Sequence, residues 1–132
     1  MTKHSPMAVL AAVIMAAAVG CAMQPDSGPD ADRGARLFAQ ECAACHGADA
    51  MGAEVGPDLT GLAARNGGVF PRDFVMSTID GYARGNRHAN PMSVFGDGGL
   101  GPTVVVEDDD GLGTPVPSDL LALTVFLESV QR

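Results

Sequence analysis

The sequence predicts one small all-α domain of three to four helices, with a short β-hairpin or flap at about residues 103–117. Three observations support this prediction. Residues 32–132 are long enough for one domain and too short for two. Apolar side chains recur with helical spacing in three segments, at about 33–45, 71–82 and 118–130. Between these segments the chain is rich in glycine and proline, which is typical of loops.

The first predicted helix covers about residues 33–45. Asp30 or Asp32 can cap it, because a short carboxylate accepts hydrogen bonds from the unpaired amide groups of a first turn. We expect the helix to end at His46 and Gly47. Four side chains at positions i, i+3, i+7 and i+10 form its apolar face: Ala35, Phe38, Cys42 and Cys45.

The second predicted helix covers residues 71–82. Pro71 suits the first position of a helix, where its missing amide proton costs nothing. Its apolar face is formed by Val75, Ile79 and Tyr82. The preceding segment 47–69 is expected to be mostly loop, with a turn or two of helix at 59–65.

The C-terminal third combines a strand signal with a helix signal. Residues 103–106 are β-branched, and Asp110-Gly111 is a turn signal, which together predict the hairpin or flap. The last helix is expected to start at Ser118 or Asp119. Its apolar stripe consists of Leu123, Phe126, Leu127 and Val130.

Residues 1–20 read as a signal peptide of the lipoprotein type, followed by a flexible tether at 21–31. The apolar run from Met7 to Val19 is shorter than the roughly 20 residues that a membrane span requires. The end of this segment resembles a lipobox, and lipidation of Cys21 explains an otherwise odd cysteine count. We therefore expect an exported protein that is anchored to the periplasmic side of a membrane. The alternative is cleavage at residues 16–18, which gives a soluble periplasmic protein.

The charge balance is strongly acidic, with 16 acidic and 8 basic residues and a net charge of −8. Such a chain repels phosphate backbones, which excludes nucleic acid as a partner. It favours a redox protein partner with a basic docking patch, although acidity can also serve solubility alone.

The segment from Cys42 to His46 is a C-x-x-C-H motif, which predicts covalent attachment of one haem c. Two thiols on one helical turn can each bond to one haem vinyl group, and the adjacent His46 then becomes the proximal iron ligand. A structural zinc site needs four ligands, and only His88 remains outside the signal segment. A thioredoxin-like pair requires a β-α-β context that is not predicted, and a plain disulfide is the remaining alternative.

The candidates for the sixth iron ligand are reduced by elimination. Met51 is too near His46 to reach the opposite haem face, and Met76 lies in the second predicted helix, where methionine usually packs in the core. Met92 lies in a loop rich in proline and glycine and is the preferred ligand. His88, four residues earlier, is the runner-up.

These motifs resemble the class I, mitochondrial-type cytochrome c family over nearly all of residues 30–132. The resemblance rests on Gly34 and Phe38 with Leu123 and Phe126, on the loop 56–59 (GPDL), and on 90–92 (NPM) followed by Phe95-Gly96. It implies helices wrapped around one haem, with the Pro57 carbonyl accepting a hydrogen bond from His46 and the Met92 sulfur on the iron.

Two features depart from the family pattern. The family's lysines near the haem edge are absent, and there is no tryptophan to bond a haem propionate. Tyr82, Arg84 and Arg87 are the candidates for that propionate role, although each can equally be a solvated surface residue.

The expected function is transfer of single electrons between redox partners, without catalysis by the chain itself. A thioether and an imidazole saturate the iron, which suits electron transfer. The alternatives are a sensor or peroxidase with an open or histidine-ligated sixth site, or a fixed cytochrome subunit of a larger oxidoreductase.

Overall fold

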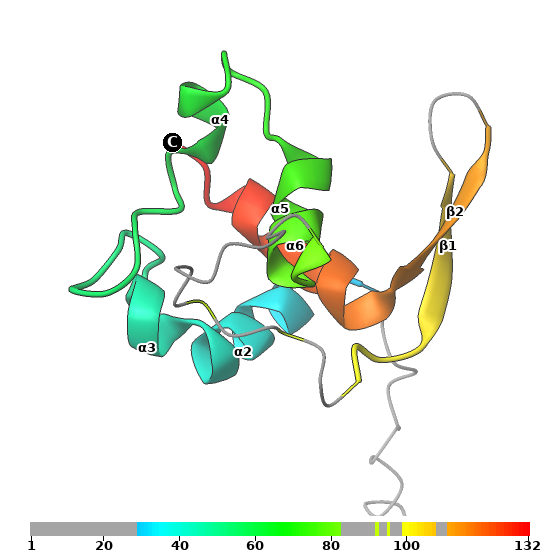
Figure 1. The fold of residues 1–132 in the computed structure, drawn as a ribbon, viewed down its shortest axis with the longest axis horizontal. Helices are drawn as coiled ribbons and strands as arrows, with labels where there is room; N and C mark the ends of the chain where they lie inside the picture. Colours follow the sequence, from blue (N-terminus) through cyan, green and yellow to red (C-terminus); the bar gives the residue numbers. More distant parts are fainter. Residues whose placement is uncertain (1–28, 83–91, 93–94, 96–98, 108–110) are drawn as a thin grey trace, which may run out of the picture.

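The computed structural model describes residues 29–82, 92, 95, 99–107 and 111–132. In chain order, its elements are α2 (Ala31–Glu41), α3 (Ala43–His46), α4 (Leu62–Arg65), α5 (Arg72–Ile79), β1 (Thr103–Glu107), β2 (Gly113–Pro117) and α6 (Ser118–Ser129). Figure 1 shows α6 in the middle of the domain, with α2 crossing it, α5 beside it and the two strands projecting to one side.

The first helix begins as predicted but is broken near its end. The Asp30 carboxylate accepts a 2.6 Å hydrogen bond from the Arg33 amide, so Asp30 is the cap. At Cys42 the backbone leaves regular helical geometry, with φ at −118°, and α3 starts one residue later. The prediction of one continuous helix over 33–45 is therefore wrong. The carbonyl of Cys42 accepts from the amides of Cys45 and His46, so a new hydrogen-bonded turn starts at this residue.

The crossing of α2 and α6 forms the centre of the core. Gly34 lies so close to α6 that a Cβ atom there would overlap the carbonyl oxygen of Ala122 and approach the Phe126 Cβ to 2.6 Å. The rings of Phe38 and Phe126 pack with centroids 5.2 Å apart. Glycine at position 34 therefore permits the close packing of α2 on α6, since a larger residue would force the helices apart.

The α5 helix packs against α6 and buries Val75 and Ile79. Tyr82 was expected on the same face, but it is 87% exposed. The helix ends at Ile79, and Gly81 then adopts a positive φ of 86°, which turns the chain out of the helical phase before Tyr82.

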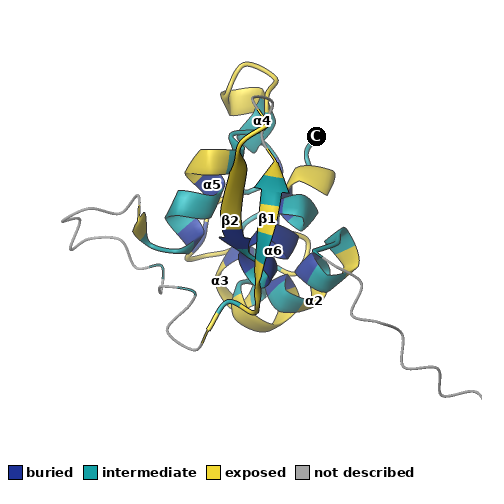
Figure 2. Ribbon diagram, turned by 90° about the vertical axis from the view of Figure 1, so that its right-hand side faces the viewer, coloured by how far each residue is buried: buried dark blue, intermediate teal, exposed yellow. Residues whose placement is uncertain are grey.

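The predicted hairpin is confirmed, so the domain is mainly helical and not strictly all-α. The two strands are antiparallel and pair Thr103 with Pro117 and Glu107 with Gly113. Figure 2 shows that β2 is exposed along most of its length and buried only at its base, where Val116 meets α6. Within the described residues, no helix combines the length and apolarity needed to cross a bilayer.

Candidate cofactor site

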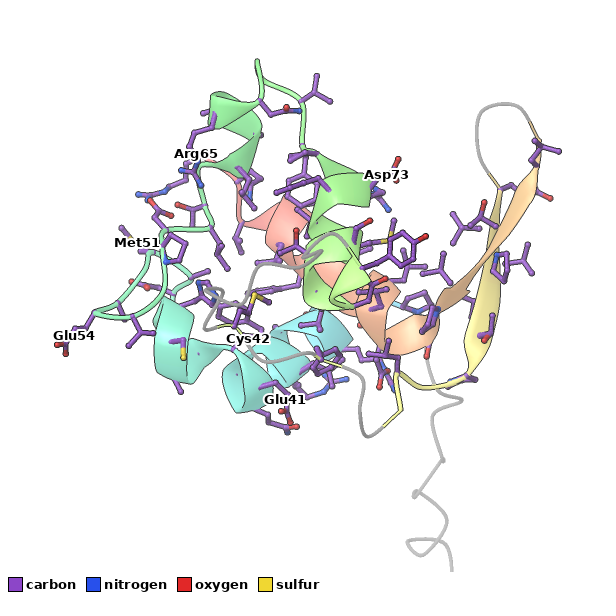
Figure 3. All side chains as sticks on the ribbon, viewed as in Figure 1. Glu41, Cys42, Met51, Glu54, Arg65 and Asp73 are labelled. Carbon is purple, nitrogen blue, oxygen red and sulfur yellow. The ribbon has the colours of Figure 1, made fainter. Side chains whose placement is uncertain are left out.

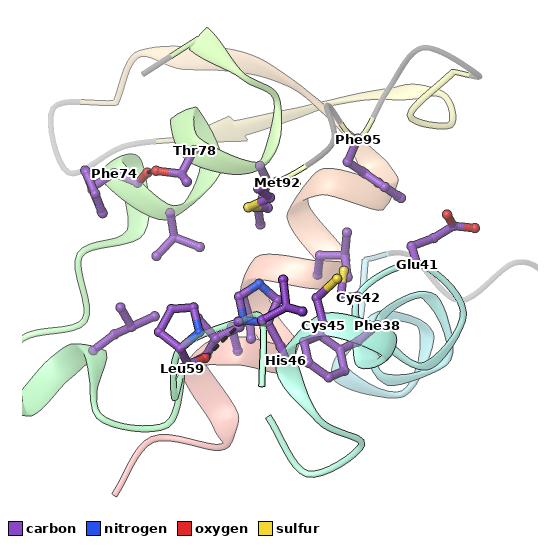
Figure 4. A pocket seen from close by; sticks show the side chains of 18 residues that line it. Phe38, Glu41, Cys42, Cys45, His46, Leu59, Phe74, Thr78, Met92 and Phe95 are labelled. Atoms are coloured by element: carbon purple, nitrogen blue, oxygen red, sulfur yellow. Dashed lines mark hydrogen bonds between the residues drawn. The ribbon is translucent and has the colours of Figure 1, made fainter. Parts of the chain in front are cut away.

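A cavity of about 490 Å³ opens between the helices, and its volume lies in the range of small-molecule and cofactor sites. Figure 4 looks into it. Its lining is mostly apolar. All five described helices contribute to it, and α4 does so through Leu62 alone. The lining residues are Phe38, Glu41, Cys42, Cys45, His46, Val55, Gly56, Pro57, Leu59, Leu62, Phe74, Val75, Thr78, Ile79, Met92, Phe95, Leu123 and Leu127.

His46 is the last residue of α3, and it is only 8% exposed. Its Nδ1 atom lies 3.0 Å from the carbonyl oxygen of Pro57. A carbonyl oxygen can only accept, so Nδ1 carries the proton and donates, which leaves Nε2 with its lone pair. The imidazole is thus held in the tautomer that a metal ligand requires, with its orientation fixed by a second residue.

The loop that supplies Pro57 approaches the imidazole closely because residue 56 is glycine. A Cβ atom on Gly56 would lie 2.5 Å from the Cys45 carbonyl oxygen and 2.8 Å from His46 Nδ1. The amide of Gly56 donates to that same carbonyl at 2.8 Å. Gly56 therefore allows the loop to approach His46, and Pro57 then accepts the hydrogen bond from its imidazole.

Cys42 and Cys45 lie side by side at one edge of the cavity, close to His46 (Figure 4). Cys42 is half-buried and Cys45 is exposed, and the two are separate thiols. Burial raises the pKa of Cys42 to about 11, and the nearby Glu41 carboxylate and Cys45 add to the shift.

Met92 lies across the cavity from His46 (Figure 4). Its neighbour Phe95 also lines the cavity, and the Phe95 amide donates to the carbonyl of Ile79 at 3.2 Å. This bond ties the loop to the end of α5. The structure therefore brings together an imidazole, two thiols and a thioether around one apolar space, as the motifs predicted.

This arrangement fits a haem c. Two thiols at one edge match covalent attachment, and a buried histidine with its Nδ1 proton engaged matches an axial ligand. The Met92 thioether on the far side is a group of the kind that could serve as a second iron ligand. The apolar walls would enclose the faces of a porphyrin.

The remaining predicted residues lie elsewhere. Tyr82 is outside the cavity lining, and its amide donates to the Asp80 carboxylate, so its proposed propionate contact gains no support. Arg84, Arg87, His88 and Cys21 lie outside the described residues.

Sequence reasoning missed residues that reach the site indirectly or at its mouth. Phe74 and Val55 line the cavity while remaining 61% and 64% exposed. Phe74 lies off the apolar face that periodicity assigned to its helix, so no helical pattern could identify it. Gln131 holds the loop that carries Pro57, and only the folded contacts show this.

Comparison with known proteins gives one match. The family model described as cytochrome c matches residues 31–105, which is more than half of the chain. Searches of curated protein sequences and of solved structures found nothing similar to the chain.

Proposed function

Because the chain belongs to the cytochrome c family, we propose that it carries single electrons through one haem at the periplasmic face of a membrane. Family membership itself establishes haem-based electron transfer and covalent attachment of haem c, for which Cys42 and Cys45 form the attachment pair. The haem supplies an iron that alternates between ferric and ferrous states. The axial ligands, the number of haems and the cellular location belong to the proposal.

The His46–Pro57 hydrogen bond, facing Met92 across an apolar cavity, is the observation that supports the proposal most strongly. It provides an oriented imidazole on one side and a thioether on the other. If both groups ligated a haem iron, the iron would have no free position for oxygen or peroxide. A change in its oxidation state would then require little movement of the protein. The chain's own contribution is to hold the two ligands and to exclude water.

A catalytic alternative would need an acid or base near the sixth position. Among the described residues that line the cavity, Glu41 is the only carboxylate, and it lies next to Cys42 on the attachment side. This placement favours a carrier over a peroxidase.

Met92→Ala tests the assignment. A thioether stabilises ferrous iron, so the variant should have a lower reduction potential and should bind cyanide or carbon monoxide. Met51→Ala is the matched control, because Met51 is 48% exposed and outside the cavity lining. Haem staining after denaturing electrophoresis should show covalent haem in all three proteins. If Met92→Ala and the wild type have the same potential and exclude ligands equally, the assignment of Met92 is wrong.

The mouth of the cavity supports a partner with a basic docking face. Val55 and Phe74 give the mouth exposed apolar surface, and Figure 3 shows the Glu41 and Glu54 side chains pointing away from the domain. Several described arginines are engaged within the chain, in the pairs Arg33–Asp119, Arg72–Glu128 and Arg132–Asp58. Two acidic side chains thus point outward, one of them (Glu41) from the cavity lining, and an acidic surface is complementary to a basic rim around a second redox centre.

Two small oxidants of opposite charge test this docking face. Glu41→Gln with Glu54→Gln should slow oxidation of the ferrous protein by tris(phenanthroline)cobalt(III) and speed oxidation by ferricyanide, most clearly at low salt. Glu107→Gln is the control, because it removes a carboxylate charge on the projecting hairpin, away from the cavity. Equal rates for the double variant and the wild type with both reagents would refute the acidic docking face.

The membrane location rests on the sequence alone, since Cys21 lies outside the described residues. We infer a lipid anchor at Cys21. Cys21→Ala should move the protein from the membrane fraction to the soluble fraction with its haem spectrum unchanged. A wild-type N-terminus that carries no lipid in mass spectrometry would exclude the anchor.

A further inference from the structure

We propose that Gln131, the second residue after α6, is a positioning residue that tunes the reduction potential by holding the Pro57 carbonyl against His46. The inference rests on the proposed function, because it assumes that His46 ligates the haem iron. It assigns a role to a residue that touches neither the cavity nor the histidine.

The side-chain amide of Gln131 joins three parts of the chain. Its Nε2 donates to the carbonyl of Leu59 at 2.9 Å and to the carbonyl of Leu127 at 2.7 Å. Its Oε1 accepts from the amide of Ala63 at 2.9 Å. Only this orientation of the amide works, because the reverse would place an oxygen against two carbonyl oxygens. One side chain thus connects α6 to the loop after Pro57 and to the start of α4.

Arg132 strengthens the same connection. Its backbone amide donates to the Thr60 carbonyl at 2.9 Å, and its Nε donates to the Thr60 hydroxyl at 2.8 Å. Its ion pair with Asp58 is longer, at 3.3 Å, and both side chains are substantially exposed. An exposed pair contributes little, so we assign the main effect to Gln131.

Pro57 depends on its neighbours for its position. Proline has no amide proton, so it cannot anchor itself through a backbone donor, and Pro57 is exposed. On one side, Gly56 is held by the Cys45 carbonyl. On the other side, Leu59 is held by the Ala50 carbonyl and by Gln131. The position of the Pro57 carbonyl therefore depends on hydrogen bonds to α3 on one side and to Gln131, after α6, on the other.

The electrochemical consequence has a definite sign. A hydrogen bond from Nδ1 to a carbonyl makes an imidazole more basic at Nε2, and a more basic ligand favours ferric iron. Loss of the Gln131 bonds lets Pro57 move away and weakens that hydrogen bond. The ferrous state is then relatively more stable, and the reduction potential rises.

The test uses the haem-loaded protein and the neutral substitution Gln131→Met, which has similar length but lacks both polar groups. Gln40→Met is the matched control, because Gln40 is exposed on α2. We expect the redox equilibrium of Gln131→Met to move toward ferrous by roughly two- to tenfold, the effect of losing part of one hydrogen bond, or roughly 20–60 mV. Nuclear magnetic resonance should also show faster solvent exchange of the His46 Nδ1 proton. Arg132→Lys, which keeps the charge, should shift both quantities less.

The outcomes separate a positioning role from a merely structural one. If Gln131→Met lowers the denaturation midpoint while the potential and the Nδ1 proton exchange match those of Gln40→Met, Gln131 is only structural and the inference is wrong. If Gln131→Met does not retain haem, the same two readouts on Gln131→Glu decide, because Glu keeps the acceptor for Ala63 and loses the donor to Leu59. Values equal to those of Gln40→Glu then overturn the inference. If the wild type lacks covalent haem or a histidine ligand, the proposed function itself has failed.

Discussion

The crossing of α2 with α6 and the loop from Gly47 to Gly61 are held in place by different forces. At the crossing, Gly34 and Phe38 contact Ala122 and Phe126 through close apolar packing. In the loop, Ala50 is the only fully buried hydrophobic side chain among the described residues 47–61. The conformation of this loop depends instead on backbone hydrogen bonds to the carbonyls of Cys45 and Ala50 and on contacts from residues 131–132.

The difference separates stability from redox tuning. Apolar burial is the main source of folding free energy and is insensitive to direction. Hydrogen bonds contribute less to stability but fix where donors and acceptors lie. The crossing should therefore determine whether the domain folds, and the loop should determine how its histidine behaves. Substitutions in the two regions should affect different measurements.

Phe126→Ala should give the largest loss of stability. It removes the partner of Phe38 at the crossing, and Phe126 is not itself one of the lining residues. We expect unfolding to become easier by about 3 kcal/mol, the lower end for a large aromatic residue because Phe126 is only partly buried. Denaturant titration measures this, and the reduction potential should be nearly unchanged. Leu112→Ala on the hairpin, 67% exposed, is the control with little effect. A large shift in potential would break the separation between the two regions.

Gly34→Ala should be destabilising although alanine favours helices by about 1 kcal/mol over glycine. The added Cβ meets the Ala122 carbonyl, which is backbone and cannot move aside cheaply. We expect a net cost of about 1–2 kcal/mol from overpacking. Gln40 is exposed on the same helix, so the difference between Gln40→Gly and Gln40→Ala reports the glycine-to-alanine propensity effect alone. Equal or greater stability of Gly34→Ala would show that the helices are less closely packed than described.

The smallest expected effect is the change with pH in the stability that Asp58 contributes to the loop. Hydrogen bonds from the Thr60 hydroxyl and amide hold the pKa of Asp58 below its usual range, and Arg132 and Arg65 contribute. Because the folded pKa lies below the unfolded value of about 3.9, the stabilisation is present at neutral pH and is lost as the pH falls through the folded pKa.

Asp58→Asn should accordingly reduce the loss of stability below about pH 4. Denaturant midpoints at pH 7, 4 and 3 measure this, with Glu54→Gln on the same loop as the control. An identical pH profile for Asp58→Asn and the wild type would mean that these hydrogen bonds do not form in solution.

The two regions also differ in how far the sequence predicts them. Helical periodicity identified the apolar faces of the two helices, and the family resemblance indicated that these helices pack on each other through Gly34 and Phe38. The C-x-x-C-H motif identified Cys42, Cys45 and His46 because attachment chemistry needs neighbours in sequence. Periodicity failed at Tyr82, where Gly81 turns the chain, and at Cys42, where a new hydrogen-bonded turn starts.

The role of Gln131 has no local signal. Its partners Leu59 and Ala63 lie 72 and 68 residues away in the chain. A polar residue after a helix is common, and only the folded arrangement shows that it bridges α6 to the histidine loop. The sequence predicts the ligands of such a site better than the residues that position them.

The proposed electron transfer depends most on an iron that would be closed on both sides by His46 and Met92. Addition of carbon monoxide to the dithionite-reduced wild-type protein at neutral pH tests this directly through the Soret spectrum. We expect no spectral change, because a ligating Met92 thioether would occupy the position that carbon monoxide would take. Prompt formation of a carbon monoxide complex would show an open sixth site and would contradict the assignment of this protein as an electron carrier closed by Met92.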